Sequence, residues 1–213
     1  MKIGILGSGN VGKELAIGFL KLGHDVMIGT REINKLEDWL KKYENKIKVG
    51  SFEETSKFSE IIVLATLWTG TENAIKLAGI NNFNNKIVID VTNPLKFVKE
   101  NSPPDFIASL GNSGGEQVQK WLDKSKVVKA FNMMSASTMC NPKKKEGIAD
   151  LYIAGNEEGK KFVIDVAKKW GYKEIYDVGD ISQSYYIETL AMLWIIIAFK
   201  NKHWSSAFKL LKE

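Results

Sequence analysis

The chain has few of the residues that build disulfide frameworks, metal sites and membrane spans. Its single cysteine, Cys140, excludes an intramolecular disulfide and fits a reducing cytosol. The two histidines, His24 and His203, lie far from it and from each other, so they offer no metal-ligand spacing, and we expect no metal site. The most apolar run, residues 190–199, has ten residues. A membrane span needs about twenty, so this run predicts a buried helix and no membrane association.

Charge and composition indicate an ordinary globular protein. The net charge of +5 comes from 30 basic and 25 acidic residues spread along 213 positions, and pI is near 9.0. The one dense run, residues 143–145, is short and follows Pro142, which favours a solvated loop over a nucleic-acid site. Met1 leads directly into an apolar segment with no secretory-signal pattern. We therefore expect a cytoplasmic protein with no nucleic-acid partner.

The first 31 residues form a complete β-α-β pattern around a glycine-rich turn. An apolar strand at 2–6 leads into the turn at 7–12, a helical segment follows at 13–22, and a second strand covers 25–28. The turn reads Gly7-Ser8-Gly9-Asn10-Val11-Gly12, which is G-x-G-x-x-G between a strand and a helix. In this motif Gly7 permits the tight turn, Gly9 lets the backbone approach a pyrophosphate, and Gly12 lets the helix pack on the strand. The pattern predicts a dinucleotide site.

The end of the second strand indicates which dinucleotide binds. An NAD-preferring site carries Asp or Glu here for the ribose 2′-OH, whereas this chain has Thr30 and Arg31, with no carboxylate until Glu32. A hydroxyl beside a guanidinium suits a 2′-phosphate, and Lys35 is a further candidate cation. The alternative is that Arg31 is a solvated loop residue. We predict NADP as the cofactor.

Apolar runs and helical periods alternate along the rest of the chain, which predicts an α/β fold with a doubly wound, mostly parallel Rossmann sheet. The expected strands are 47–49, 61–66, 86–90, 126–131, 152–154 and 174–178; the expected helices are 33–43, 52–58, 71–78, 116–122, 157–170 and 183–199. Residues 96–112 are expected to be a loop. Residues 1–180 would form the dinucleotide-binding domain, and 181–213 a helical cap or dimerisation element.

Ligands of such sheets bind outside the carboxyl ends of the strands. The segments 7–12, 29–31, 66–68, 92–94 and 132–134 all follow predicted strands, so we expect them to line one crevice.

With these segments placed, the chain resembles the NADPH-dependent reductases of the deazaflavin coenzyme F420 and the related domain of membrane metalloreductases. The motifs that carry the resemblance are 7–12, Leu22-Gly23-His24, Gly29-Thr30-Arg31, Ala65-Thr66-Leu67-Trp68, Thr92-Asn93-Pro94-Leu95, Val128-Lys129-Ala130-Phe131-Asn132 and 188–194. The chain departs from the family at Leu67, where proline is frequent, and at Met133, where a small hydroxyl residue is common.

The resemblance implies positions for the parts of the cofactor. Pyrophosphate contacts fall on Ser8, Gly9, Asn10 and Val11, 2′-phosphate contacts on Thr30, Arg31 and Lys35, and contacts flanking the nicotinamide on Trp68 and near Met134. The other strand-end residues expected at the cofactor are Thr66, Leu67, Asn93, Pro94 and Asn132.

Hydride transfer to a flavin-like ring needs apposition and exclusion of water more than acid-base chemistry. The sequence shows no Ser-His-Asp set and no paired carboxylates at a strand end, so we name no catalytic residue. Asp90 is expected to bond turn amides, and Cys140 to be an inert thiol. Trp68 either stacks on a ring or seals the crevice.

The predicted function is hydride transfer between NADPH and a deazaflavin or flavin acceptor, in a homodimer formed through the C-terminal helix. One alternative is another small NADP reductase of the pyrroline-5-carboxylate reductase kind, although predicted strands occupy much of the stretch that its dimerisation domain would need. A non-enzymatic NADP(H) sensor is the third possibility.

Overall fold

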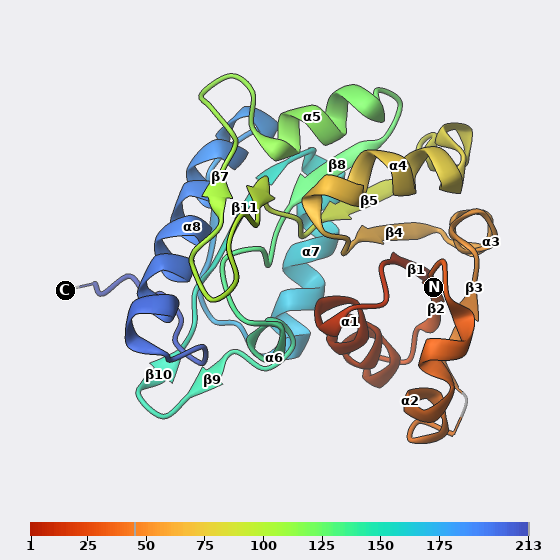
Figure 1. The fold of residues 1–213 in the computed structure, drawn as a ribbon, viewed down its shortest axis with the longest axis horizontal. Coiled ribbons are helices and arrows are strands. Elements are labelled where there is room, and N and C mark those ends of the chain that lie inside the picture. The colour runs from red at the N-terminus through yellow and green to blue at the C-terminus, as the bar shows by residue number, and fades with distance from the viewer. Residues whose placement is uncertain (45, 213) are drawn as a thin grey trace.

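An eight-stranded sheet with the strand order β12-β11-β8-β5-β4-β1-β2-β3 forms the centre of the molecule (Figure 1). The computed structural model describes residues 1–44 and 46–212. Neighbouring strands of this sheet are parallel, apart from the antiparallel pair β8–β11. The predicted doubly wound, mostly parallel sheet is therefore confirmed.

The elements follow one another along the chain in this order. The first half comprises β1 (Lys2–Leu6), α1 (Asn10–Lys21), β2 (Asp25–Gly29), the 3₁₀ helix η1 (Ile33–Leu36), α2 (Glu37–Lys41), β3 (Lys48–Gly50), α3 (Phe52–Phe58), β4 (Ile61–Leu64), α4 (Trp68–Ala78), η2 (Ile80–Phe83) and β5 (Ile87–Asp90). The second half comprises β6 (Leu95–Lys96), β7 (Asp105–Phe106), α5 (Gly114–Trp121), β8 (Lys126–Lys129), α6 (Ala136–Met139), β9 (Lys143–Lys144), β10 (Gly147–Ile148), β11 (Leu151–Gly155), α7 (Glu157–Trp170), β12 (Ile175–Asp177), η3 (Ile181–Gln183) and α8 (Ser184–Asn201).

The central strands are apolar at consecutive positions because both of their faces are covered. In β4, Ile61 and Val63 join the apolar cluster that contains α1 and α7 residues. Ile62 and Leu64 join the second cluster, with residues of α4 and α5. Helices thus lie on both faces, and the carboxyl edge of the sheet stays open to a ligand.

Three local predictions were wrong. The helix expected at 33–43 is broken into η1 and α2. The loop expected at 96–112 contains the short antiparallel pair β6–β7. Residues 143–145 begin the β9–β10 hairpin, and the Lys144 ammonium donates a hydrogen bond to Thr138 Oγ1 at 2.6 Å rather than facing only solvent. Two-residue ladders are too short to show a period of two, so the sequence pattern does not reveal them.

The C-terminal segment packs along the body of the molecule. Helix α8 buries a face that includes Ile187, Glu188 and Ala191, and the tail returns so that Trp194 Nε1 donates to Ser206 O at 2.9 Å. Residues 181–201 are long and apolar enough to cross a membrane by length and composition alone. A buried face that carries a carboxylate is typical of a packed helix.

Candidate dinucleotide-binding site

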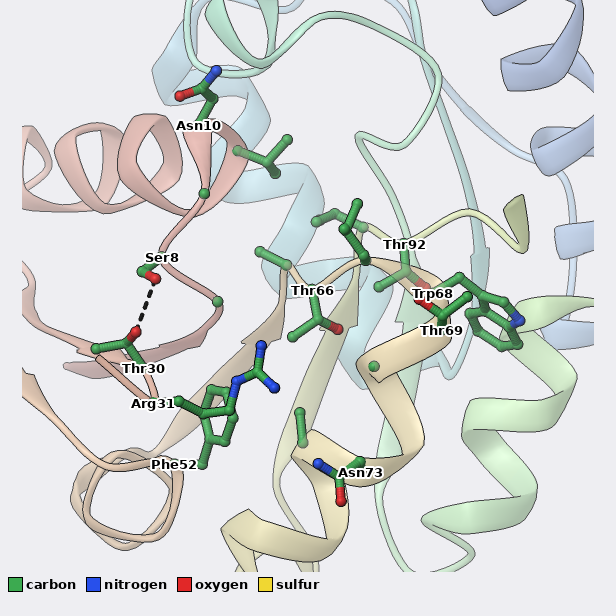
Figure 2. Close-up of a pocket in the computed structure, with 18 of the residues that line it drawn as sticks. Ser8, Asn10, Thr30, Arg31, Phe52, Thr66, Trp68, Thr69, Asn73 and Thr92 are labelled. Atoms are coloured by element: carbon green, nitrogen blue, oxygen red, sulfur yellow. Dashed lines mark hydrogen bonds between the residues drawn. The ribbon is translucent and has the colours of Figure 1, made fainter. Parts of the chain in front are cut away.

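A cleft of about 730 Å³ opens at the carboxyl edge of the sheet, where β1, β2, β4 and β5 end (Figure 2). Its lining residues come from loops and helix starts that follow these strands: 7–11, 30–32, Lys35, Phe52, 65–70, 73–74, 91–93, Leu95 and Phe97. Four of the five strand-end segments predicted to share one crevice contribute to this lining, whereas the fifth, 132–134, does not.

The three glycines of the turn have different surroundings. Gly7 has φ +127°, and a Cβ there would collide with the carbonyl of Ala65. A Cβ at Gly12 would collide with the carbonyl oxygen of Gly7, so close packing of α1 on the turn requires glycine. No other part of the described chain lies within 4 Å of a Cβ built on Gly9. The space above Gly9 is therefore free for a ligand.

Helix α1 starts at this space without a side-chain cap. The described structure shows no side-chain hydrogen bond to its first turn, and no acidic residue lies there. By contrast, α5 and α7 begin with the caps Ser113 and Asn156. The first amides of α1, at Asn10 and Val11, and the positive end of the helix dipole can therefore bind a pyrophosphate.

The glycine-rich turn is joined to the end of β2 by two hydroxyl groups. Ser8 Oγ and Thr30 Oγ1 share a hydrogen bond of 2.9 Å, and Thr30 Oγ1 also accepts the Glu32 amide at 3.2 Å. The Thr30 side chain is buried. Thr30 therefore shapes the turn in which the next residue, Arg31, is presented.

Arg31 is the only arginine in the sequence, and its side chain extends into the cleft (Figure 2). Beside it, the Lys35 ammonium lies 2.6 Å from a Glu32 carboxylate oxygen. The hydrogen bond and charge of Lys35, together with the charge of Arg31, lower the pKa of Glu32. Two cations thus face one carboxylate, which leaves this end of the cleft net positive and suits a 2′-phosphate.

The opposite end of the cleft is apolar at its rim. Leu67 and Phe97 line it and are 71% and 60% exposed. Trp68 also lines it, but its indole stacks on Trp121, with ring centroids 5.5 Å apart and planes 27° from parallel. Figure 2 shows this indole turned away from Thr66 and Arg31. Of the two roles considered for Trp68, sealing the crevice fits this geometry better than stacking on a ring.

Buried polar contacts support this end from behind. Asn93 Nδ2 donates to Asn132 O at 2.8 Å, and Asn132 Nδ2 donates to Asn93 Oδ1 at 2.7 Å. Asp90 Oδ1 accepts the Thr92 amide at 2.9 Å and the Thr92 hydroxyl at 2.7 Å. Asp90 therefore bonds turn groups, as predicted.

The structure brings most of the predicted cofactor residues to the cleft wall. Those in the lining are Gly7, Ser8, Gly9, Asn10, Val11, Thr30, Arg31, Lys35, Thr66, Leu67, Trp68 and Asn93. Gly12, Pro94, Asn132 and Met134 lie behind it: Pro94 packs near Gly114, and Met134 Sδ accepts the Tyr172 hydroxyl at 2.9 Å. Direct cofactor contact by these four stays a prediction.

Several lining residues were not predicted. Phe52 and Asn73 come from α3 and α4, and Phe97 follows β6 in a stretch with no periodic signal. Thr69 and Gly70, in the first turn of α4, also line the cleft. These two could have been predicted, because a helix that follows a strand at this edge exposes its start to the ligand.

Titratable side chains in the lining, which lies wholly within the described chain, are confined to Arg31, Glu32 and Lys35. Burial raises the pKa of the Cys140 thiol to about 12, and burial, the N-terminal amine and Lys169 lower that of His24. Neither residue is in the cleft lining. No group of three or more His, Cys, Asp or Glu suited to a metal ion occurs among the described residues. The site can bind and orient, and it offers no general acid or base at the apolar end.

Comparisons with known proteins agree with this geometry. The family model described as NADP oxidoreductase coenzyme F420-dependent matches residues 2–94. The F420-dependent NADP reductase of Methanocaldococcus jannaschii is 30% identical over 216 aligned residues, covering 95% of this chain and 94% of that protein. Metalloreductase STEAP3 of Rattus norvegicus is 26% identical, and the match covers 90% of this chain but 36% of that protein.

Solved structures give the same assignment. A candidate F420-dependent NADP reductase from Arthrobacter sp. FB24 superposes with a TM-score of 0.93 at 32% identity, covering all of both chains. The reductive aminase of Aspergillus terreus, solved with NADPH4, has a TM-score of 0.66 at 15% identity over 94% of this chain and 62% of that one; it shows the shared fold. The chain belongs to the family of F420-dependent NADP reductases.

Proposed function

We propose that this protein transfers a hydride between NADPH and a deazaflavin of the coenzyme F420 class. The observation that carries the proposal is the two-ended cleft: cations stand at one end and exposed apolar side chains at the other, with uncapped helix starts between them. The names of the relatives found by both comparisons support this choice of donor and acceptor.

The residues at hand fit NADP along its length. Arg31 and Lys35 would bind the 2′-phosphate, the amides of Asn10 and Val11 the pyrophosphate, and Gly9 leaves the space that the phosphates require. When bound, the nicotinamide supplies the hydride that reduces the acceptor ring, and a solvent proton balances the reaction. Leu67 and Phe97 would cover that ring and exclude water, which matches a site without acid-base side chains.

The exposed apolar rim also argues against a sensor that only binds NADP(H). Large apolar side chains exposed around a cleft indicate a site for a second apolar group. A sensor would need the glycine-rich turn and Arg31, but it would have no use for Leu67 and Phe97 beside the nicotinamide end.

The test is NADPH oxidation by the purified protein against a panel of coenzyme F420, FMN, FAD and ferric chelates. We expect turnover with the deazaflavin to exceed turnover with FMN and FAD. Turnover with none of the four would contradict the proposal and favour the sensor, whereas turnover with ferric chelates alone would place the chain functionally with the metalloreductases.

We further propose a cytoplasmic homodimer that pairs through α8. Its outward face carries four apolar or aromatic residues at helical spacing, each between 37% and 57% exposed: Tyr186, Leu193, Ile196 and Ile197. Such a stripe suits association with a second helix. Light scattering should give twice the 23.9 kDa chain mass for the native protein and the monomer mass for Leu193→Glu; a native monomer would contradict the dimer.

A further inference from the structure

Three buried charges lie behind the apolar end of the cleft. The Lys129 ammonium forms ion pairs with Asp90 at 2.7 Å and Glu188 at 2.8 Å, and all three side chains are fully buried. Lys129 Nζ also donates to the Thr92 carbonyl at 2.8 Å. Burial opposes the charged form of Lys129, but the two carboxylates outweigh it and raise the pKa of this lysine. The cluster is therefore a fixed ionic unit.

A buried cluster of charges is energetically unfavourable compared with an apolar core of the same volume. Removing charges from water carries a large desolvation penalty, and apolar side chains of the same volume often stabilise a protein as well or better. Stability alone therefore explains the cluster poorly. The groups that the cluster holds in place explain it better. Two sets of hydrogen bonds connect it to the cleft, one through Thr92 and one through the start of α5 beside Trp68.

The first route ends at Thr92, which lines the cleft. Asp90 accepts both the amide and the hydroxyl of Thr92, and Lys129 binds its carbonyl. The amide, the hydroxyl and the carbonyl of Thr92 are thus all hydrogen-bonded to the cluster. The next residue, Asn93, exchanges hydrogen bonds with Asn132, so the whole turn after β5 is fixed.

The second route ends at Trp68. The Glu188 carboxylate accepts the amides of Gly114 and Gly115, each at 2.9 Å, at the start of α5. A Cβ on Gly114 would lie 3.2 Å from Pro94 Cδ and 3.2 Å from Trp68 Cζ3. The Glu188 carboxylate therefore sets how closely α5 packs against the residues that begin α4.

We propose that Asp90, Lys129 and Glu188 are positioning residues that hold the nicotinamide end of the cleft in the geometry needed for hydride transfer. They act through Thr92 and Gly114, because none of the three reaches the surface of the cleft. The proposal rests on the proposed function, since hydride transfer is the reaction that this geometry serves. It assigns a role to the contact between the C-terminal helix and the sheet.

The test compares Lys129→Met with Lys160→Met. Lys160 is the matched control: it is 3% exposed and pairs with Asp177 at 2.8 Å and Glu157 at 2.6 Å. Neither partner lines the cleft, whereas Lys129 binds the cleft residue Thr92. Three quantities are measured: kcat with coenzyme F420 at saturating NADPH, the fluorescence of bound NADPH, and the affinity for adenosine 2′,5′-bisphosphate, which has no nicotinamide.

For Lys129→Met we expect kcat to fall by about 10- to 100-fold, because small misplacements of reacting groups have effects of this size. The fluorescence of bound NADPH should move toward that of free NADPH, with affinity for the bisphosphate unchanged. Lys160→Met should lose stability and change none of the three quantities. If Lys129→Met does not fold, Glu188→Gln replaces it, because the side chain keeps its shape and loses its charge.

A folded variant with native kcat and native fluorescence would overturn the proposal. Equal loss of affinity for NADPH and for the bisphosphate would also overturn it, because that result indicates general disruption. The fluorescence and binding measurements need no acceptor. If the protein fails to reduce the deazaflavin, the proposed function is contradicted, and the fluorescence and binding measurements still decide the positioning role.

Discussion

Ser8 and Thr30, which are 22 positions apart in the sequence, share a hydrogen bond of 2.9 Å between their hydroxyl groups. This bond fixes the glycine-rich turn, where a pyrophosphate would bind, to the end of β2, where a 2′-phosphate would bind. The two halves of the adenosine site therefore form one rigid unit, from which Arg31 projects into the cleft.

The first prediction concerns Arg31. Replacement by alanine should weaken NADPH binding by about 1.5–3 kcal/mol, because a charge-assisted bond to the 2′-phosphate is lost. NADH binding should change little, and Lys57→Ala, an exposed lysine paired with Glu53 on α3, is the control. Titration of nicotinamide fluorescence measures all of these affinities. Equal losses for NADPH and NADH would show that Arg31 does not read the 2′-phosphate.

Because the chain has one arginine, an arginine reagent provides a second check of the same role. Arg31 is the one guanidinium that phenylglyoxal can modify. Its modification should weaken NADPH binding at least as much as Arg31→Ala does, and NADPH should protect it better than NADH. Full modification with retained NADPH affinity would be inconsistent with this role.

The second prediction separates two glycines of the turn. Gly9→Ala should cost about 1 kcal/mol of stability or less, since the position has open space around it. Its NADPH affinity should nevertheless fall by roughly tenfold or more, about 1.4 kcal/mol, because the new methyl group occupies the phosphate space. Calorimetry and thermal unfolding measure the two effects. If Gly9→Ala binds NADPH with native affinity, the pyrophosphate does not bind at this position.

Gly12→Ala should behave in the opposite way. Its Cβ meets the Gly7 carbonyl in the free protein, so we expect a loss of about 1–3 kcal/mol in the free energy of unfolding. Equal stability of the Gly9 and Gly12 variants would contradict the assigned roles.

The third prediction tests the apolar rim. Leu67→Ala should raise the KM for the acceptor by about 3- to 10-fold, the effect of losing roughly 1 kcal/mol of apolar contact. Because Leu67 is largely exposed, the stability of the free protein should not change. Leu77→Ala, a half-exposed position outside the cleft on α4, the helix that follows Leu67, is the control. A native KM in Leu67→Ala would place the acceptor elsewhere.

The fourth prediction concerns Cys140. Its pKa of about 12 leaves little thiolate at pH 8, so alkylation by iodoacetamide should be at least on the order of 100-fold slower in the native than in the unfolded protein. The chain has one cysteine, so the total rate reports this thiol alone. Similar rates in both states would mean that the thiol is reactive and that its inert role is wrong.

The sequence predicts those elements whose ends are encoded locally. Helices α3 and α7 begin and end where expected, because a Ser51–Glu54 capping box starts α3 and the Asn156 side chain caps α7. The family resemblance is likewise confirmed by the comparisons. Residues that directly follow parallel strands, such as Thr66 and Asn93, were found in the cleft because topology alone takes them there.

Features that depend on long-range packing could not be predicted in this way. Lys129 meets Asp90 and Glu188 across 39 and 59 positions of sequence, and no periodic pattern links these positions. The side-chain direction of Trp68 depends on Trp121, and Phe97 reaches the cleft directly after the two-residue strand β6. Pattern reasoning gives the segment in these cases but not the direction in which a side chain points.

Isotope transfer tests the proposed reaction most directly. NADPH carrying deuterium on the transferable C4 position is incubated with coenzyme F420 and the protein in ordinary water, and the reduced deazaflavin is analysed by mass spectrometry. We predict one deuterium per reduced ring. NADPH and oxidised coenzyme F420, each followed by its absorbance, should be consumed in equal molar amounts. Reduced deazaflavin without deuterium, or no reduction at all, would contradict direct hydride transfer from NADPH by this protein.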